Sequence, residues 1–157
     1  WKEPNSHLLI GEMNDFFPDF KYIHTVRHGL DMAFSPNQQQ LFNWGPLFGV
    51  DVPTTENDIP PASFRYWVEA NRLALEKGEK LGPKRFLWIN YDQLCTDPEP
   101  EIRKLLTFLE VDATDAIVRR CAELPAVAST TGRFRNHPME GFEEKDLVFL
   151  NTLGFGT

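Results

Sequence analysis

The stretch Lys21–Ser35, KYIHTVRHGLDMAFS, decides the fold, because an apolar strand pattern within it ends abruptly at a charged turn. Side chains that favour β-structure run from Tyr22 to Val26, and Arg27 follows directly. We therefore predict a buried strand that ends at Val26. The carboxyl ends of the strands in an open α/β sheet face the ligand crevice, so Arg27 is expected to be the first side chain to reach a ligand.

Arg27 and Ser35 have the chemistry to bind a phosphate group. A guanidinium offers a planar fork of hydrogen-bond donors, and a serine hydroxyl adds one more. The same residues also fit a structural role, in which Arg27 pairs with Asp31 and Ser35 caps the helix that starts near Pro36. Residue types alone favour the structural role.

The remaining pattern alternates helices with strands. It predicts a second strand over Phe86–Asn90 and a long helix over residues 62–81, in which Trp67 packs in the core. Segment 36–61 is rich in proline and glycine and is predicted to be a long loop. Further helices are predicted near residues 7–17, 99–109, 115–124 and 143–153. Such alternation favours the α/β class, with an open parallel sheet flanked by helices.

Composition favours one globular domain over residues 1–157. Hydrophobic residues make up 41% of the chain, and 13 phenylalanines are available for a core. The net charge of −7 argues against a general nucleic-acid binder, and the apolar runs are too short to cross a bilayer. The two cysteines and four histidines lack the spacing of metal ligands, so no metal site is predicted. We expect a cytoplasmic location.

The segment from Val26 to Ser35 resembles the 3′-phosphate motif of sulfotransferases. That family uses 3′-phosphoadenosine 5′-phosphosulfate (PAPS), and its motif joins a strand, Val-Arg, a short turn and a small-residue helix that ends in Ser. The chain keeps the motif at Val26, Arg27, Asp31, Ala33 and Ser35. It departs from the motif at His28 and Gly29.

Three other segments also resemble the family, and together with the first they follow one another along the chain in the family's order. Residues 1–4, Trp-Lys-Glu-Pro, are similar to its WKEP segment. Residues 85–94 resemble a strand followed by YEDL, with Gln93 in place of the usual acid. Residues 129–135 resemble the GRWR-type loop that closes over the cofactor, with Phe134 where Trp is commoner. The resemblance implies the P-loop NTPase-like sulfotransferase fold.

The family's first strand and its Gly/Ser/Thr-rich phosphosulfate loop have no counterpart in the sequence. We therefore expect a single sulfotransferase-like domain, residues 1–157, that lacks its N-terminal part, so that the fold is incomplete. Activity of these 157 residues alone is not assumed.

The resemblance implies transfer of a sulfuryl group from PAPS to a hydroxyl or amine acceptor, which leaves adenosine 3′,5′-bisphosphate. Fixed cations stabilise the charge that spreads in such a transfer. Lys2 would take that role in the family, whereas without the family it is a surface lysine. Glu3 and His7 are the nearby candidates for the base.

Cofactor binding is assigned by the same resemblance. Arg27 and Ser35 would hold the 3′-phosphate, and Tyr91 would contact the nucleotide. Further candidates are Ser129, Thr130 and Arg133. Considered alone, the basic residues of this last loop are equally consistent with a solvated surface. No metal is expected to take part.

The sequence is also compatible with two other functions. One is an ATP-dependent relative of the P-loop kinases, and the other is a non-catalytic module that retains the nucleotide pocket. The acceptor is a small molecule, a glycan or a peptide, and the sequence does not identify it. Oligomer formation also stays open.

Overall fold

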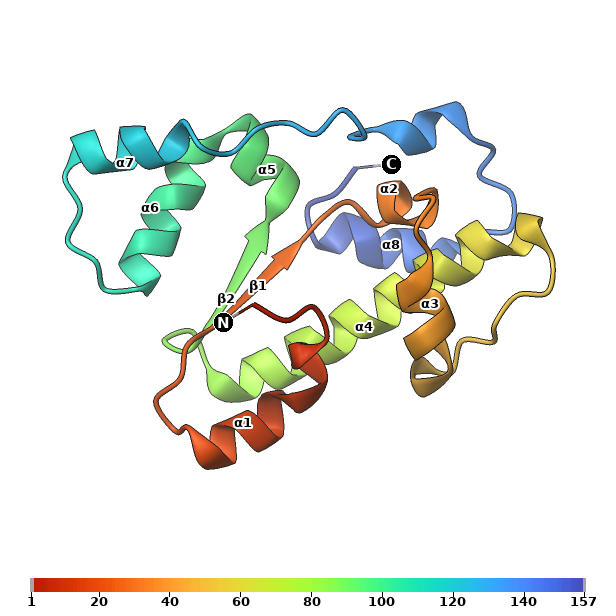
Figure 1. The fold of residues 1–157 in the computed structure, drawn as a ribbon, viewed down its shortest axis with the longest axis horizontal. Helices are drawn as coiled ribbons and strands as arrows, with labels where there is room; N and C mark the ends of the chain where they lie inside the picture. Colours follow the sequence, from red (N-terminus) through yellow and green to blue (C-terminus); the bar gives the residue numbers. More distant parts are fainter. Residues whose placement is uncertain (1, 157) are drawn as a thin grey trace. The chain divides into compact units, whose positions relative to one another are not determined.

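The computed structural model describes residues 2–156, and the chain divides into two compact units. Residues 1–26 and 73–128 form one, which we call the sheet unit. Residues 27–72 and 129–157 form the other, which we call the helical unit. Figure 1 labels the α-helices and the strands of both units.

Two parallel strands form the centre of the sheet unit. Strand β1 (Tyr22–Val26) lies beside β2 (Phe86–Asn90) in Figure 1. The register of the pair runs from Tyr22 opposite Phe86 to Val26 opposite Asn90. Both strands have the predicted bounds. Their parallel pairing confirms the expected class, because parallel strands need a long crossover connection, here provided by helical segments.

Helices flank this strand pair within the sheet unit. They are η1 (Ser6–Leu9), α1 (Ile10–Phe16), α5 (Tyr91–Thr96), α6 (Pro98–Phe108), α7 (Asp115–Ala122) and residues 73–81 of α4 (Ile59–Leu81). Gly78 of α4 lies against Phe86, since a Cβ atom at position 78 would stand 2.5 Å from the ring. The helix therefore approaches the strand at a distance that only glycine allows.

The helical unit contains residues 59–72 of α4 and several shorter elements. They are α2 (Gly29–Ala33), α3 (Gln39–Trp44), η2 (Gly45–Phe48), η3 (Glu56–Asp58), η4 (Arg133–Asn136) and α8 (Glu144–Thr152). The prediction of a long loop over residues 36–61 was wrong, because α3, η2 and η3 lie within it. Leu41 and Val50 from this segment pack with Tyr66 and Ala70 of α4.

Aromatic rings fill the core of the helical unit. The ring of Trp67 stacks on Phe64 and meets Phe149 and Phe155 edge-on, which confirms the prediction that Trp67 is a core residue. Gly29 lies under these rings, since a Cβ atom there would stand 2.7 Å from Trp67. The departure from the family motif at position 29 thus has a local reason: a larger residue would collide with the core.

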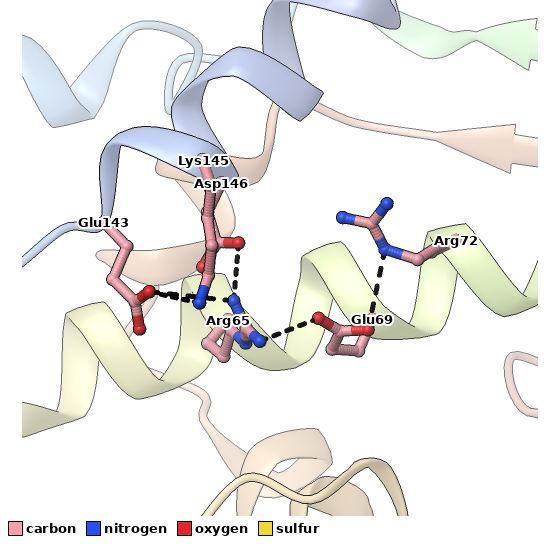
Figure 2. A network of polar contacts seen from close by, with 6 residues as sticks. All are labelled: Arg65, Glu69, Arg72, Glu143, Lys145 and Asp146. Atoms are coloured by element: carbon pink, nitrogen blue, oxygen red, sulfur yellow. Dashed lines mark hydrogen bonds and ion pairs between the residues drawn. The ribbon is translucent and has the colours of Figure 1, made fainter.

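A buried carboxylate joins α8 to α4 (Figure 2). Asp146 of α8 is 2% exposed, and its Oδ1 accepts a hydrogen bond from Nη1 of Arg65 at 2.7 Å. This hydrogen bond raises the pKa of Arg65. Arg65 also contacts Glu69 one turn further along α4, and Glu69 in turn pairs with Arg72. The network fixes α8 within its unit through a charge that has little access to water.

Candidate functional site

Asp31, in the first turn of α2, fixes a distant loop of the helical unit. Its side chain is buried, and its Oδ2 accepts the N–H of Gly132 at 2.7 Å. Its Oδ1 accepts the N–H of Phe134 at 3.3 Å. Gly132 has a φ of 77°, a left-handed conformation that favours glycine. We call these two contacts the Asp31 clamp, because they hold the segment 129–136 on α2.

Three of the predicted cofactor residues meet beside the Asp31 clamp. Nη2 of Arg27 donates to Oγ1 of Thr130 at 3.2 Å, although the two residues are 103 positions apart. Arg133 donates through Nε to the carbonyl oxygen of Thr130 and through Nη1 to that of Phe34, both at 3.3 Å. The helical unit therefore gathers two guanidinium groups and a hydroxyl, a set of groups suited to bind a phosphate.

Ser35 follows α2, and its position is fixed by its neighbours. Its Oγ accepts the N–H of Asn37 at 3.3 Å, so Ser35 does not cap α3, which begins at Gln39. Gln38 closes the end of α2 instead. Its amide group donates at 3.2, 2.8 and 2.6 Å to the carbonyl oxygens of Met32, Ala33 and Ser35.

Position 28, where the chain departs from the family motif, has a capping role. Nδ1 of His28 accepts the N–H of Leu30 at 3.3 Å and so caps the start of α2. The other ring nitrogen, Nε2, then carries the proton and donates to the carbonyl oxygen of Gly156 at 2.6 Å. The ring also stacks on Phe134 at 4.6 Å. His28 thus supports both α2 and the clamped segment.

The candidate catalytic residues near the N-terminus belong to the sheet unit. Lys2 and Glu3 are exposed, and Oε1 of Glu3 accepts the N–H of Asn5 at 3.2 Å. Trp1, the first residue of the WKEP-like segment, lies outside the described residues. Lys2 and Glu3 therefore have the access to solvent that contact with a substrate requires.

His7, by contrast, is only 4% exposed. Burial lowers its pKa below the ordinary value of 6.5, the hydrogen bond with the carbonyl oxygen of Pro4 opposes this shift, and the charge of Lys77 adds to it. The imidazole is therefore neutral at pH 7. A neutral imidazole has a lone pair for a proton, but burial limits its contact with an acceptor.

Tyr91 directly follows β2 and begins α5. Asn90 starts this helix, since its Oδ1 accepts the N–H groups of Asp92 and Gln93 at 3.0 and 3.1 Å. Tyr91 is half-buried. The sheet unit thus holds Lys2, Glu3, His7 and Tyr91, and the helical unit holds Arg27, Ser35, Ser129, Thr130 and Arg133. Ser129 is exposed and precedes Thr130 in the clamped segment.

Residues 2–156 contain no group of three or more His, Cys, Asp or Glu side chains that could hold a metal ion. None of the helices formed by these residues is both long and apolar enough to cross a membrane. Cys95 and Cys121 are free thiols.

Sequence reasoning missed the roles of Asp31, Gln38 and His28. A signal for Asp31 was present, because Leu30 and Ala33 on either side of it are apolar and indicate a helix that is buried around its first turn. The partner of Asp31 was not visible, because Gly132 lies 101 positions away in the chain. The capping role of His28 was hidden by the departure from the motif.

Comparison with known proteins places the fold in the class of sulfotransferase domains. A solved structure, "Sulfotransferase Domain from the Curacin Biosynthetic Pathway", matches with a TM-score of 0.66 and covers 98% of this chain and 61% of its own. Sequence identity in this match is 17%, so the likeness concerns the fold.

Sequence comparison then identifies the family. Residues 1–115 match the model described as "Sulfotransferase family", and the chain belongs to the sulfotransferase family. Over 117 residues it is 24% identical to protein-tyrosine sulfotransferase A of Caenorhabditis elegans and 25% identical to the Drosophila melanogaster protein-tyrosine sulfotransferase. An uncharacterized Aquifex aeolicus protein is 28% identical over the same length. Each match covers 74% of this chain but only 28%, 22% and 14% of the respective relative.

Proposed function

We propose that this chain serves in the transfer of a sulfuryl group from PAPS to a hydroxyl or amine acceptor, and that its helical unit binds the 3′-phosphate. One observation carries the proposal. Arg27, Thr130 and Arg133, which family resemblance alone assigned to the cofactor, meet beside the Asp31 clamp. Two guanidinium groups and a hydroxyl form a donor set that matches a phosphate dianion.

The chemistry of the transfer explains the proposed roles in the sheet unit. The acceptor oxygen or nitrogen forms a bond to sulfur while the bond from sulfur to the bridging phosphate oxygen breaks, and that oxygen keeps the electron pair. A cation such as Lys2 stabilises the charge on the departing oxygen. The acceptor proton passes to a base, and we favour Glu3 over His7 because Glu3 is exposed and His7 is buried.

The first test is calorimetric titration with three nucleotides. Adenosine 3′,5′-bisphosphate and AMP differ only in the 3′-phosphate, and ADP represents the nucleotide of a kinase. We expect the bisphosphate to bind at least about tenfold more tightly than AMP, because hydrogen bonds to a charged group contribute about 1.5–3 kcal/mol. Tighter binding of ADP than of the bisphosphate would instead favour a kinase relative.

Two variants test whether Arg27 causes the preference for the bisphosphate over AMP. Arg27→Ala should remove most of the advantage of the bisphosphate over AMP, because it deletes one of the two guanidinium groups. Arg120→Ala is the matched control, since Arg120 is exposed on α7 and lies outside the donor set. If both variants bind the bisphosphate as the unmodified chain does, the assignment of the 3′-phosphate to Arg27 is wrong.

A further inference from the structure

A second binding feature of the helical unit is a cavity of about 660 Å³. It is lined by residues from the end of α2 and the following turn, from η3 and the start of α4, and from the segment 137–142. Its size lies within the usual range for small-molecule sites, about 300–1,000 Å³. Ser35 belongs to its lining, so the cavity begins at one of the residues proposed to hold the cofactor phosphate.

Aromatic and apolar groups form much of the cavity wall. The ring of Phe34 stacks on that of His137 at 4.3 Å with only 7° between their planes. Phe142 packs against Phe34 at 5.8 Å. Ile59, Pro60 and Pro61 from the start of α4 add aliphatic surface. A flat apolar body, such as a phenyl ring, suits these surroundings.

The charged side chains of the cavity lining have one sign, although Arg133 lies next to the lining and donates to the carbonyl oxygen of Phe34. Glu56 and Glu140 are exposed residues of the lining, and neither makes an ion pair within residues 2–156. The lining includes no Lys or Arg side chain. His137 is its only other titratable side chain. Two carboxylates repel a nucleotide that carries several negative charges, and they attract a cation. The lining carboxylates therefore favour a cation over PAPS, whose 3′-phosphate is assigned to Ser35 and the neighbouring guanidinium groups.

We propose that this cavity binds the acceptor, and that the acceptor is a small hydroxylated amine: a protonated ammonium group on an apolar body that also carries a hydroxyl. The acceptor role rests on the proposed sulfuryl transfer. An ammonium group has no lone pair, so the hydroxyl oxygen is the atom that attacks sulfur. A bond forms from that oxygen to sulfur, the bond from sulfur to the phosphate oxygen breaks, and the hydroxyl proton passes to the base.

Three phenols test the charge preference, measured by ligand-observed NMR on the purified chain without nucleotide. Tyramine carries an ammonium group, p-cresol has no charge, and 4-hydroxyphenylacetate carries a carboxylate. We expect tyramine to bind about fivefold more tightly than p-cresol, because an exposed ion pair contributes up to about 1 kcal/mol. The carboxylate compound should bind most weakly. Equal binding of tyramine and p-cresol, or binding of none of the three, would overturn the proposal.

The double variant Glu56→Gln/Glu140→Gln keeps the shape of both side chains and removes their charges. Tyramine should then bind no better than p-cresol, whereas Glu79→Gln, an exposed residue of α4 outside the cavity lining, should keep the preference. In the unmodified chain, about 0.5 M NaCl should also reduce the preference by screening. An unchanged preference in the double variant would contradict the proposed site. Nucleotide titrations test the cofactor assignment separately, so the two proposals can fail independently.

Discussion

Among the described residues, buried carboxylates occur in the helical unit and not in the sheet unit, although aromatic rings pack in both. In the helical unit, the buried carboxylates of Asp31 and Asp146 accept directed hydrogen bonds from Gly132, Phe134 and Arg65. In the sheet unit, rings stack along the paired strands, with the ring centroids of Tyr22 and Phe86 6.0 Å apart and their planes nearly parallel. Directed bonds to a charge fix the position of a loop, whereas stacked rings chiefly remove apolar surface from water.

The difference indicates where each unit is sensitive to substitution. A buried carboxylate that loses its partner is still shielded from water, and no interaction then offsets the free energy of removing its charge from water. Small chemical changes at such a carboxylate in the helical unit should therefore reduce stability strongly. A ring stack tolerates chemical change if its volume is kept. The four predictions below test this contrast, from the largest expected effect to the smallest.

Arg65→Met should destabilise the chain most, by about 2–4 kcal/mol, because it leaves Asp146 buried without its charged partner. The measurement is the free energy of unfolding in urea. Arg72→Met is the control on the same helix. Arg72 is about half exposed, and its loss should cost under about 1 kcal/mol. Equal losses of stability in the two variants would show that the burial of Asp146 does not make its ion pair more important than an exposed one.

Asp31→Asn should cost about 2–3 kcal/mol, because an amide cannot accept hydrogen bonds from both Gly132 and Phe134 through two oxygens. It should also weaken binding of adenosine 3′,5′-bisphosphate, since the segment with Thr130 and Arg133 loses its anchor. Urea unfolding and calorimetry measure the two effects. Asp112→Asn, an exposed position in the sheet unit, should change neither. A variant that is less stable but binds normally would separate the Asp31 clamp from the binding site.

Gly29→Ala should cost about 1–3 kcal/mol, because its added methyl group would collide with the rings of Trp67 and Phe64. Gly11→Ala makes the same chemical change in α1, where no atom lies within 4 Å of the new methyl group apart from the neighbouring residues and backbone of the helix itself. That control should stabilise the chain by about 0.5–1 kcal/mol, since alanine favours a helix. Thermal unfolding followed by circular dichroism compares the two variants. If Gly29→Ala also stabilised the chain, the core around Gly29 would have room for a methyl group, contrary to the structure.

Acidification tests the buried imidazole of the sheet unit. The pKa of His7 is lowered in the folded chain, so the unfolded chain binds the proton first as the pH falls below 6.5. Stability due to neutral His7 is therefore present above pH 6.5 and is lost below it, by up to about 1.4 kcal/mol between pH 7.5 and pH 5.5. His7→Gln should lack this part of the loss when unfolding is measured at both values. Identical pH dependence of the two chains would contradict the pKa shift.

Sequence patterns located the strands well but located the helices less well. Both strands have the predicted bounds, because an apolar run with a sharp polar end is a local signal. Helix α4 begins at Ile59 instead of Ala62, since Pro60 and Pro61 are tolerated in a first turn, where their missing N–H groups have no partners. The short helix α5 was missed because its start depends on the side chain of Asn90.

For the site, the sequence predicted the candidate residues but not the contacts between them. Family resemblance identified Arg27, Thr130 and Arg133 as separate candidates, and the structure adds their contact. For Asp31, the local alternative was a pair with Arg27 one turn away, whereas the observed acceptor contacts go to Gly132 and Phe134. Contacts over such a chain separation depend on the folded backbone. Sequence spacing alone contains no information on them.

The Asp31 clamp also affects the dynamics of the segment that it holds. The amide hydrogens of Gly132 and Phe134 are bound to a buried carboxylate, so they should exchange slowly with deuterated solvent although neighbours such as Ser129 and Arg135 are exposed. A segment that is already ordered before a nucleotide arrives loses little conformational entropy on binding. More of the interaction free energy with a phosphate then remains as affinity, and the encounter needs no prior folding of the loop.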